Sequence, residues 1–210
     1  MISSIVLAGG KSLRLGRDKA KEDLGGQSLI QRVVSCVATL SSEILVVTAP
    51  GHAVPSICSP TPWRVALDLY PGRGSLGGIY SGLKYSHSFH SLAVGCDMPF
   101  LNPGLLRYMV NLCPDFDVVI PRIGGGVEPL HAIYSKNCLG PIEALLQQGN
   151  LQIFAFFPSV RTRYVEEDEV DRYDARHLSF FNVNTEDDLN QAKALLQEQE
   201  VEAYPKGSDR

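Results

Sequence analysis

Short apolar runs of strand length recur along the chain and alternate with stretches of helical periodicity. The apolar runs span Ser4–Leu7, Ile44–Thr48, Val65–Leu69, Leu92–Cys96, Val118–Ile120 and Leu130–Tyr134. Between several of them, apolar residues return every three or four positions, as in residues 29–37, 78–85 and 103–112. Strands that alternate with helices form a mostly parallel sheet with helices on both faces. The pattern therefore predicts an α/β fold with three α/β/α layers, of Rossmann-like type.

The C-terminal part of the chain carries a clear helix signal. Thr185 is a suitable N-cap, and Asp188 stands at the third helical position of a capping box. The apolar stripe that should dock this helix on the sheet consists of Leu189, Ala192, Leu195 and Leu196. From residue 197 the periodicity is lost, so we expect residues 197–210 to form a flexible tail. The acidic residues 166–169 are interpreted as a solvated loop.

The segment that follows the first strand has the composition of a phosphate-binding loop. Gly9 and Gly10 are followed by Lys11, Arg14, Arg17 and Lys19, four basic residues within nine positions. Glycine lets backbone N–H groups approach a ligand closely, and Lys and Arg supply charge for phosphate oxygens. This segment therefore predicts a nucleoside triphosphate site.

Two other phosphate motifs compete for this interpretation. Gly10-Lys11-Ser12 would end a Walker loop, but the first glycine of that loop would fall at Ile5, inside the strand. A G-x-G-x-x-G pattern occurs at 72–77, and Asp97 follows about 20 residues later, as in NAD(P)-binding Rossmann proteins. That fingerprint usually follows the first strand of the fold, and here it would leave residues 7–19 unexplained.

Composition narrows the class of protein. The chain has 210 residues, a formal net charge of −4 and five cysteines. This charge gives no general attraction to nucleic acid or an anionic membrane, and no apolar run reaches the length of a membrane span. The odd number of cysteines and the absence of a C-x-x-C pair favour reduced thiols. We therefore expect a cytoplasmic protein that binds neither nucleic acid nor membrane.

The spacing L-A-G-G-x-S-x-R-x-G-x-D-K at residues 7–19 resembles the signature of the molybdenum cofactor guanylyltransferases, a nucleotidyltransferase family. Four later blocks match in the family's order, at residues 68–79, 96–101, 128–131 and 181–185. The resemblance implies a single nucleotidyltransferase domain over residues 1–196. Within it, residues 1–100 would form the nucleotide-binding half and residues 101–196 the acceptor-binding half.

The same resemblance implies an activity. GMP from GTP would pass to the terminal phosphate of molybdopterin, forming molybdopterin guanine dinucleotide and releasing pyrophosphate, with Mg²⁺ as cofactor and Mn²⁺ as substitute. Molybdoenzymes or their chaperones would be partners. Cytidylyl or uridylyl transfer to another phosphate is the rival within this class. Relatives that transfer cytidylate tend to have alanine where this chain has Gly9, which favours guanine.

The candidates for the site lie at the predicted strand ends and in the loop that follows the first strand, and their roles are those that the resemblance and the residue chemistry imply. The catalytic candidates are Arg14, Lys19 and Asp97. The nucleotide-binding candidates are Leu7, Ala8, Gly9, Gly10, Lys19, Thr48, Asp68 and Asp97. Asp97 is also the metal candidate, because it follows an apolar strand, precedes Met98-Pro99, and offers the oxygen ligand that Mg²⁺ prefers.

The acceptor candidates lie in the second half of the chain, at Pro129, Leu130, Asn182 and Asn184. The two asparagines, at i and i+2, point the same way if their segment is extended. They would then contact a pterin or help fix the metal and acceptor phosphate. The alternative is a pair of Asx turns ahead of the last helix. His131 is interpreted as structural.

Overall fold

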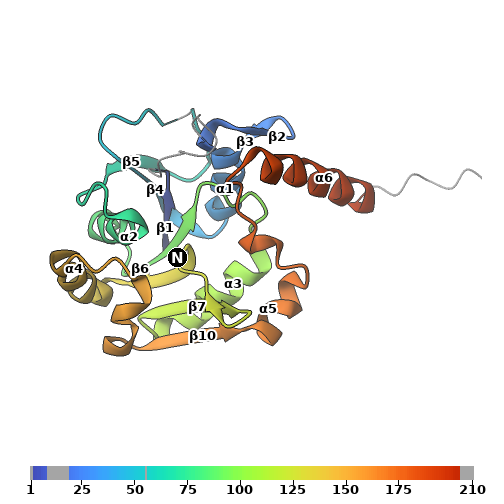
Figure 1. The fold of residues 1–210 in the computed structure, drawn as a ribbon. Helices are drawn as coiled ribbons and strands as arrows, with labels where there is room; N and C mark the ends of the chain where they lie inside the picture. Colours follow the sequence, from blue (N-terminus) through green and yellow to red (C-terminus); the bar gives the residue numbers. More distant parts are fainter. Residues whose placement is uncertain (1, 9–18, 55, 204–210) are drawn as a thin grey trace, which may run out of the picture.

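The structure is a computed structural model that describes residues 2–8, 19–54 and 56–203, and it contains the predicted three layers (Figure 1). The sheet has the strand order β10-β7-β9-β6-β1-β4-β5. These strands are β1 (Ile2–Leu7), β4 (Ser41–Thr48), β5 (Trp63–Leu67), β6 (His90–Gly95), β7 (Val118–Ile123), β9 (His131–Ser135) and β10 (Thr162–Glu166). β9 runs antiparallel to its neighbours β6 and β7, and all other pairs along this path are parallel.

Two short antiparallel pairings complete the strands. β8 (Gly126–Val127) pairs with β7 at the edge of the main sheet. β2 (Asp23–Leu24) and β3 (Gln27–Ser28) form a separate two-stranded sheet that leads into the first helix.

The helices cover both faces of the sheet. One face packs against α1 (Leu29–Ala38), α3 (Pro103–Leu112) and α5 (Glu167–Asp174). The other packs against α2 (Gly74–Tyr85), α4 (Leu139–Gln148) and the 3-10 segment Ile153–Ser159. α6 (Glu186–Ala203) closes a third apolar cluster with Leu24 and Leu29. The core is thus divided by the sheet, as expected when both faces of parallel strands are covered.

Local sequence signals explain where several helices begin. Ser28 accepts a hydrogen bond from the Gln31 backbone N–H at the start of α1, at 3.3 Å. Asn102 accepts hydrogen bonds from two backbone N–H groups at the start of α3, before Pro103. Thr185 and Asp188 form the predicted capping box of α6, with reciprocal distances of 2.8 and 3.1 Å.

Three predictions need correction. α6 continues to Ala203, seven residues beyond the predicted end at 196, and residues 204–210 lie outside the described part of the chain. The acidic residues 166–169 are not a solvated loop: they end β10 and begin α5, where Glu166 and Glu169 form a capping box. The strand predicted at Val65–Leu69 begins and ends two residues earlier, as β5.

Glycines bring α2 unusually close to β1. A Cβ atom at Gly82 would lie 2.5 Å from Cγ2 of Ile5, and one at Gly78 would lie 2.9 Å from Cδ2 of Leu7. A side chain at Gly82 would collide with several atoms of Ile5, whereas one at Gly78 would require the end of the Leu7 side chain to move. Glycine therefore sets the spacing between the two elements. Among the described helices, none is both long enough and apolar enough to cross a membrane.

Candidate active site

The parallel strands bring the predicted residues together at one edge of the sheet. β1, β4, β5 and β6 all end there, and backbone hydrogen bonds continue past their last residues. Ala8 N–H donates to the Val47 carbonyl at 2.9 Å, and Cys96 N–H donates to the Leu7 carbonyl at 3.1 Å. Asp97 therefore follows β6 next to the end of β1. Ligands of α/β sheets bind at this carboxyl edge.

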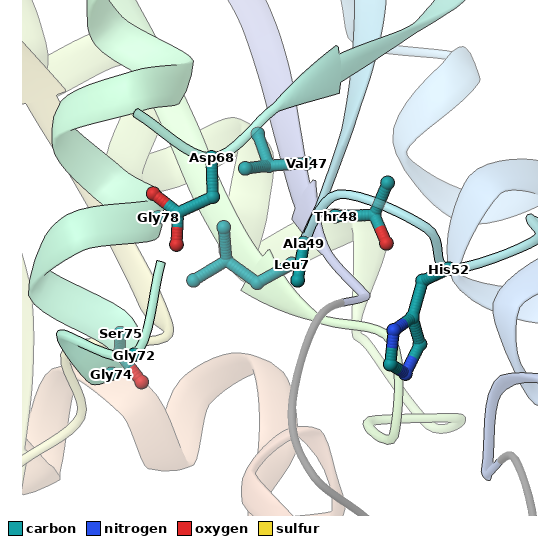
Figure 2. Close-up of a pocket in the computed structure, with 10 residues that line it drawn as sticks. All are labelled: Leu7, Val47, Thr48, Ala49, His52, Asp68, Gly72, Gly74, Ser75 and Gly78. Atoms are coloured by element: carbon teal, nitrogen blue, oxygen red, sulfur yellow. The ribbon is translucent and has the colours of Figure 1, made fainter. Parts of the chain in front are cut away.

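A cavity of about 410 Å³ opens between the ends of β1, β4 and β5 and the start of α2 (Figure 2). Its lining consists of Leu7, Val47, Thr48, Ala49, His52, Asp68, Gly72, Gly74, Ser75 and Gly78. We call it the donor cavity, because the sequence predicts that the nucleotide, which donates the transferred group, binds to residues in its wall. Three predicted nucleotide-binding residues, Leu7, Thr48 and Asp68, line it. Gly72 and Gly74 both adopt positive φ, at 82° and 62°, and a Cβ there would meet no atom within 4 Å.

Asp68 is held in place by the polypeptide around it. Its Oδ1 accepts hydrogen bonds from the Ser81 hydroxyl at 2.8 Å and from the Tyr70 backbone N–H at 3.0 Å. The backbone N–H of Asp68 donates to the Thr48 carbonyl at 2.9 Å. These contacts fix a carboxylate in the wall of the donor cavity, as a binding residue requires.

Thr48 contributes a hydroxyl that the fold leaves unsatisfied. The residue is only 2% exposed, and its Oγ1 has no hydrogen-bond partner among the described residues. A buried hydroxyl without a partner costs about 1–3 kcal/mol. A ligand in the donor cavity that offers a hydrogen bond would recover part of that cost.

Three distant segments meet beside the donor cavity in what we call the Lys19 cluster, made of Lys19, Asp97 and Asn184. Lys19 Nζ donates to Asn184 Oδ1 at 2.5 Å, across 165 positions of sequence. The same ammonium lies 3.7 Å from Asp97 Oδ2. The Val183 N–H donates to the Asp97 carbonyl at 2.9 Å, which fastens the Asn184 segment to the end of β6.

Burial dominates the electrostatics of Asp97. Desolvation raises the pKa of this carboxyl above its ordinary value, and the nearby Lys19 ammonium opposes the shift only in part. The carboxylate is therefore short of stabilising partners within the described chain. A further cation would lower its free energy.

The side chains of the two predicted asparagines have different hydrogen-bond partners. Asn184 joins the Lys19 cluster, because Asp188 accepts a hydrogen bond from its backbone N–H at 2.9 Å and holds the segment. Asn182 instead donates its amide to the Phe180 carbonyl at 2.8 Å. That both side chains serve one site stays a prediction.

A second cavity of about 660 Å³ lies at the same end of the sheet, next to β7 and β10. Its lining consists of Arg122, Gly125, Gly126, Val127, Pro129, Leu151, Ile153, Phe154 and Tyr164. Arg122 lies over the ring of Tyr164, with 4.7 Å from the guanidinium carbon to the ring centroid. Glu166 holds the same guanidinium through two hydrogen bonds, at 2.5 and 3.0 Å. We call this cavity the second cavity.

The sequence predicts only part of that lining. Pro129 was predicted, whereas Leu130 packs at the edge of the apolar core. Arg122, Phe154 and Tyr164 belong to no motif and went unnoticed. Arg122 and Tyr164 are single residues in β7 and β10, and Phe154 lies in the 3-10 segment Ile153–Ser159, so no local pattern marks them.

The remaining candidates divide into two groups. Gly9, Gly10 and Arg14 lie outside the described residues. His131 is fully buried, neither ring nitrogen has a hydrogen-bond partner among the described residues, and its ring lies 4.9 Å from that of Phe180. Burial lowers the pKa of His131 to about 4, which keeps the imidazole neutral. Its structural interpretation fits this environment.

Comparison with known proteins agrees with this geometry. Residues 4–162 match the MobA-like NTP transferase domain. A protein of Pelotomaculum thermopropionicum called probable molybdenum cofactor guanylyltransferase is 35% identical over 195 residues, which is 93% of each chain. The molybdenum cofactor guanylyltransferase of Desulfosudis oleivorans is 34% identical over 204 residues, covering 93% of this chain and 96% of that protein.

A solved structure supports the same relationship. The crystal structure of molybdopterin-guanine dinucleotide biosynthesis protein A from Archaeoglobus fulgidus is 25% identical and has a TM-score of 0.77, covering 94% of this chain and all of that one. Fold and site together define a nucleotidyltransferase. The chain belongs to the MobA-like NTP transferase family. The family prediction is confirmed, and the Gly72–Gly77 pattern belongs to the wall of a nucleotidyltransferase cavity rather than to an NAD(P) site.

Proposed function

We propose that this chain acts as a molybdenum cofactor guanylyltransferase. It transfers GMP from GTP to the terminal phosphate of molybdopterin, forming molybdopterin guanine dinucleotide and pyrophosphate. The observation that carries this function is the Lys19 cluster, which stands at the end of β6 with one cavity on each side. In the strand order, β1, β4 and β5 lead to the donor cavity, and β9, β7 and β10 lead to the second cavity.

The reaction needs negative charge to be neutralised at phosphorus. An oxygen of the acceptor's terminal phosphate attacks the α-phosphorus of GTP, and the bond from that phosphorus to the bridging oxygen of pyrophosphate breaks. Lys19 is held by Asn184 and carries a positive charge to this place. We propose that Lys19 and Arg14 stabilise the negative charge that develops on the leaving pyrophosphate.

Asp97 fits a role in metal binding. The described residues contain no group of three or more His, Cys, Asp or Glu side chains that could hold a metal ion alone. Mg²⁺ commonly binds one or two carboxylates together with substrate phosphates and water. Asp97, a largely desolvated carboxylate in contact with Lys19, suits that mode, and Mn²⁺ would substitute. When bound, the metal would supply positive charge to the phosphates.

The second cavity is our proposed place for the acceptor. Tyr164 and Phe154 offer aromatic surface for a flat heterocycle, and Arg122 offers a fixed positive charge. Pro129 lines this cavity, while Leu130 and Asn182 stay in the proposed acceptor set as neighbours of Pro129 and Asn184. Molybdoenzymes or their chaperones remain proposed protein partners, and the cytoplasm, where the five unpaired cysteines would stay reduced, remains the proposed location.

The decisive experiment offers all four labelled nucleoside triphosphates, with Mg²⁺ and molybdopterin, to the purified chain. We expect label in the dinucleotide from GTP only, with release of pyrophosphate. Transfer from CTP or UTP instead would overturn the guanine assignment in favour of the rival pyrimidine nucleotidyltransferases. Thermal stabilisation by NAD(H) but not by GTP with Mg²⁺ would contradict the whole class.

A further inference from the structure

A tight turn directly after β4 carries an imidazole to the donor cavity. The turn consists of Ala49-Pro50-Gly51-His52, and the His52 N–H donates to the Ala49 carbonyl at 3.2 Å. Gly51 has a φ of 83°. Proline in the second position and a glycine with positive φ in the third are typical of a type II turn. The backbone at His52 is thus placed by local sequence, four residues after Thr48.

The side chain of His52 stands at the edge of the donor cavity. Figure 2 shows its ring on the same side of the cavity as Thr48, with Asp68 and the Gly72–Ser75 segment across from them. The Thr48 hydroxyl is a buried group that has no hydrogen-bond partner among the described residues, and it is the one such group in a residue that lines this cavity. A ring nitrogen and an unsatisfied hydroxyl therefore line one wall.

Apolar side chains lie next to these polar groups. Leu7, Val47 and Ala49 also line the cavity, and none of them offers a side-chain hydrogen bond. An apolar surface with a few polar groups at its rim is the usual composition of a site for a flat ring. The β4 side of the cavity therefore suits a nucleobase better than it suits phosphates.

We propose that His52 is a base-recognition residue whose imidazole N–H donates a hydrogen bond to the O6 and N7 edge of guanine, beside the Thr48 hydroxyl. This role rests on the proposed function. Guanine presents two acceptors on that edge, whereas cytosine presents an amino donor there and adenine presents one of each. An imidazole ring carries at least one N–H donor. This donor matches the two acceptors of guanine, whereas the amino group of cytosine offers it no acceptor.

The test measures the dissociation constants of GTP and CTP, each with Mg²⁺, by calorimetry on the full chain. His52→Ala and His52→Phe remove the donor, so both should weaken GTP binding by about 5- to 10-fold, the usual effect of one hydrogen bond. Their CTP affinity should change by less than about twofold. His52→Gln keeps an N–H donor on a side chain of similar reach and should recover most of the GTP affinity.

His87→Ala is the matched control, because His87 precedes β6 at the opposite end of the sheet and its side chain is 81% exposed. Its GTP affinity should equal that of the unmodified chain. Unchanged GTP affinity in His52→Ala would overturn the inference and leave the proposed function standing. Full affinity in His52→Phe would also overturn it, because ring stacking alone would then account for the contact. If the unmodified chain binds no GTP, both the proposed function and the role of His52 are wrong.

Discussion

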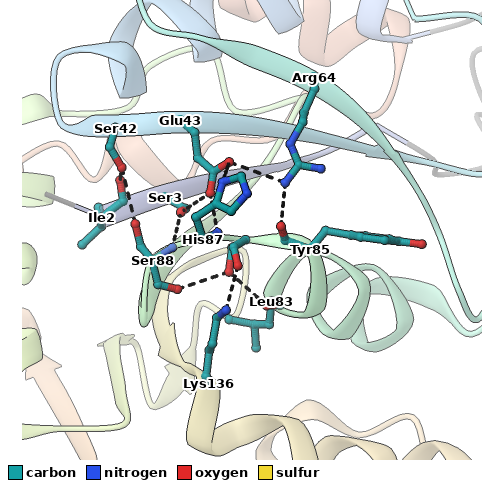
Figure 3. A network of polar contacts seen from close by, with 11 residues as sticks. Ile2, Ser3, Ser42, Glu43, Arg64, Leu83, Tyr85, His87, Ser88 and Lys136 are labelled. Atoms are coloured by element: carbon teal, nitrogen blue, oxygen red, sulfur yellow. Dashed lines mark hydrogen bonds and ion pairs between the residues drawn. The ribbon is translucent and has the colours of Figure 1, made fainter.

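Two partly buried carboxylates, Glu43 and Asp97, stand at opposite ends of the sheet and have opposite surroundings. Glu43, near the start of β4, accepts hydrogen bonds from the Ser3 hydroxyl at 2.7 Å and from the backbone and ring nitrogens of His87 at 2.6 and 2.8 Å (Figure 3). Arg64 adds a positive charge at 3.6 Å. Asp97, after β6, has the Lys19 ammonium at 3.7 Å.

The pKa values of the two groups move in opposite directions. Burial opposes ionisation of Glu43, but the hydrogen bonds from His87 and Ser3 outweigh it and lower the pKa. Burial raises the pKa of Asp97, and Lys19 compensates only in part. A carboxylate that the fold satisfies contributes to stability. One that the described residues leave short of partners is available to a ligand.

The strongest way to break this comparison is to remove the charge of Asp97. Asp97→Asn keeps the size of the side chain, and we expect guanylyl transfer to fall by roughly 10³-fold, because an electrostatic contact to the reacting phosphates is lost. Activity should recover in part with Mn²⁺ or high Mg²⁺. The melting temperature should not fall, since an incompletely paired carboxylate is removed. Activity that depends on neither the charge nor the divalent cation would remove Asp97 from the mechanism.

The partner of Asp97 should show the next largest effect. Lys19→Ala should lower kcat/KM for transfer by roughly 10²-fold, because the ammonium no longer offsets charge on the triphosphate. Lys21→Ala, in the same short 3-10 segment (Lys19–Lys21), is the matched control and should stay within about threefold of the unmodified enzyme. Near-normal turnover in Lys19→Ala would contradict the assigned role.

At the other end of the sheet, the expected effect is on stability. Glu43→Gln removes the negative charge that accepts hydrogen bonds from Ser3 and His87 and lies near Arg64, and we expect a loss of about 1–2 kcal/mol in the free energy of unfolding. Because the pKa of Glu43 is lowered in the fold, its contribution is present above the unfolded pKa and is lost as the pH falls through the folded pKa. Urea titrations at several pH values measure this. The kcat of the folded variant should equal that of the unmodified chain, and a matching loss of activity would refute the division of roles.

His131 extends the comparison to a third buried titratable group, because burial keeps its imidazole neutral. The imidazole takes a proton near pH 6.5 in the unfolded chain but only near pH 4 in the fold, so its presence destabilises the fold as the pH falls through this window. His131→Phe lacks this titration. Its free energy of unfolding, relative to that of the unmodified chain, should rise by about 1–2 kcal/mol from pH 7 to pH 5. A difference that stays constant with pH would show that His131 titrates normally.

Local patterns predicted the parts of the molecule that depend on neighbouring residues. The apolar runs located the strands, and the positions after them located Thr48, Asp68 and Asp97. The turn at 49–52 carried a similarly local signal in its Pro-Gly pair, but no motif pointed to His52. His52 lines the donor cavity because the fold places the start of α2 across from it, and the sequence of the turn does not indicate that arrangement.

What the sequence did not predict depends on distant contacts. The hydrogen bond between Lys19 and Asn184 spans nearly the whole chain, and neither residue's surroundings indicate it. β10 is an edge strand in which Val165 alone is buried, so its apolar signal is weak. The acidic start of α5 gives no apolar signal and therefore resembles a loop in the sequence. In the structure, the side chains of Glu166 and Glu169 each accept a hydrogen bond from the backbone of the other, which stabilises the helix end.

The close approach of α2 to β1 has a consequence for how this family would be read from sequence variation. Gly82 lines neither cavity, yet a methyl group there would collide with Ile5 in the central strand. In a library of random substitutions we expect this position to reject every other residue, as a catalytic position would. Intolerance to substitution at Gly82 would then reflect the close spacing of α2 and β1 and would give no information about catalysis.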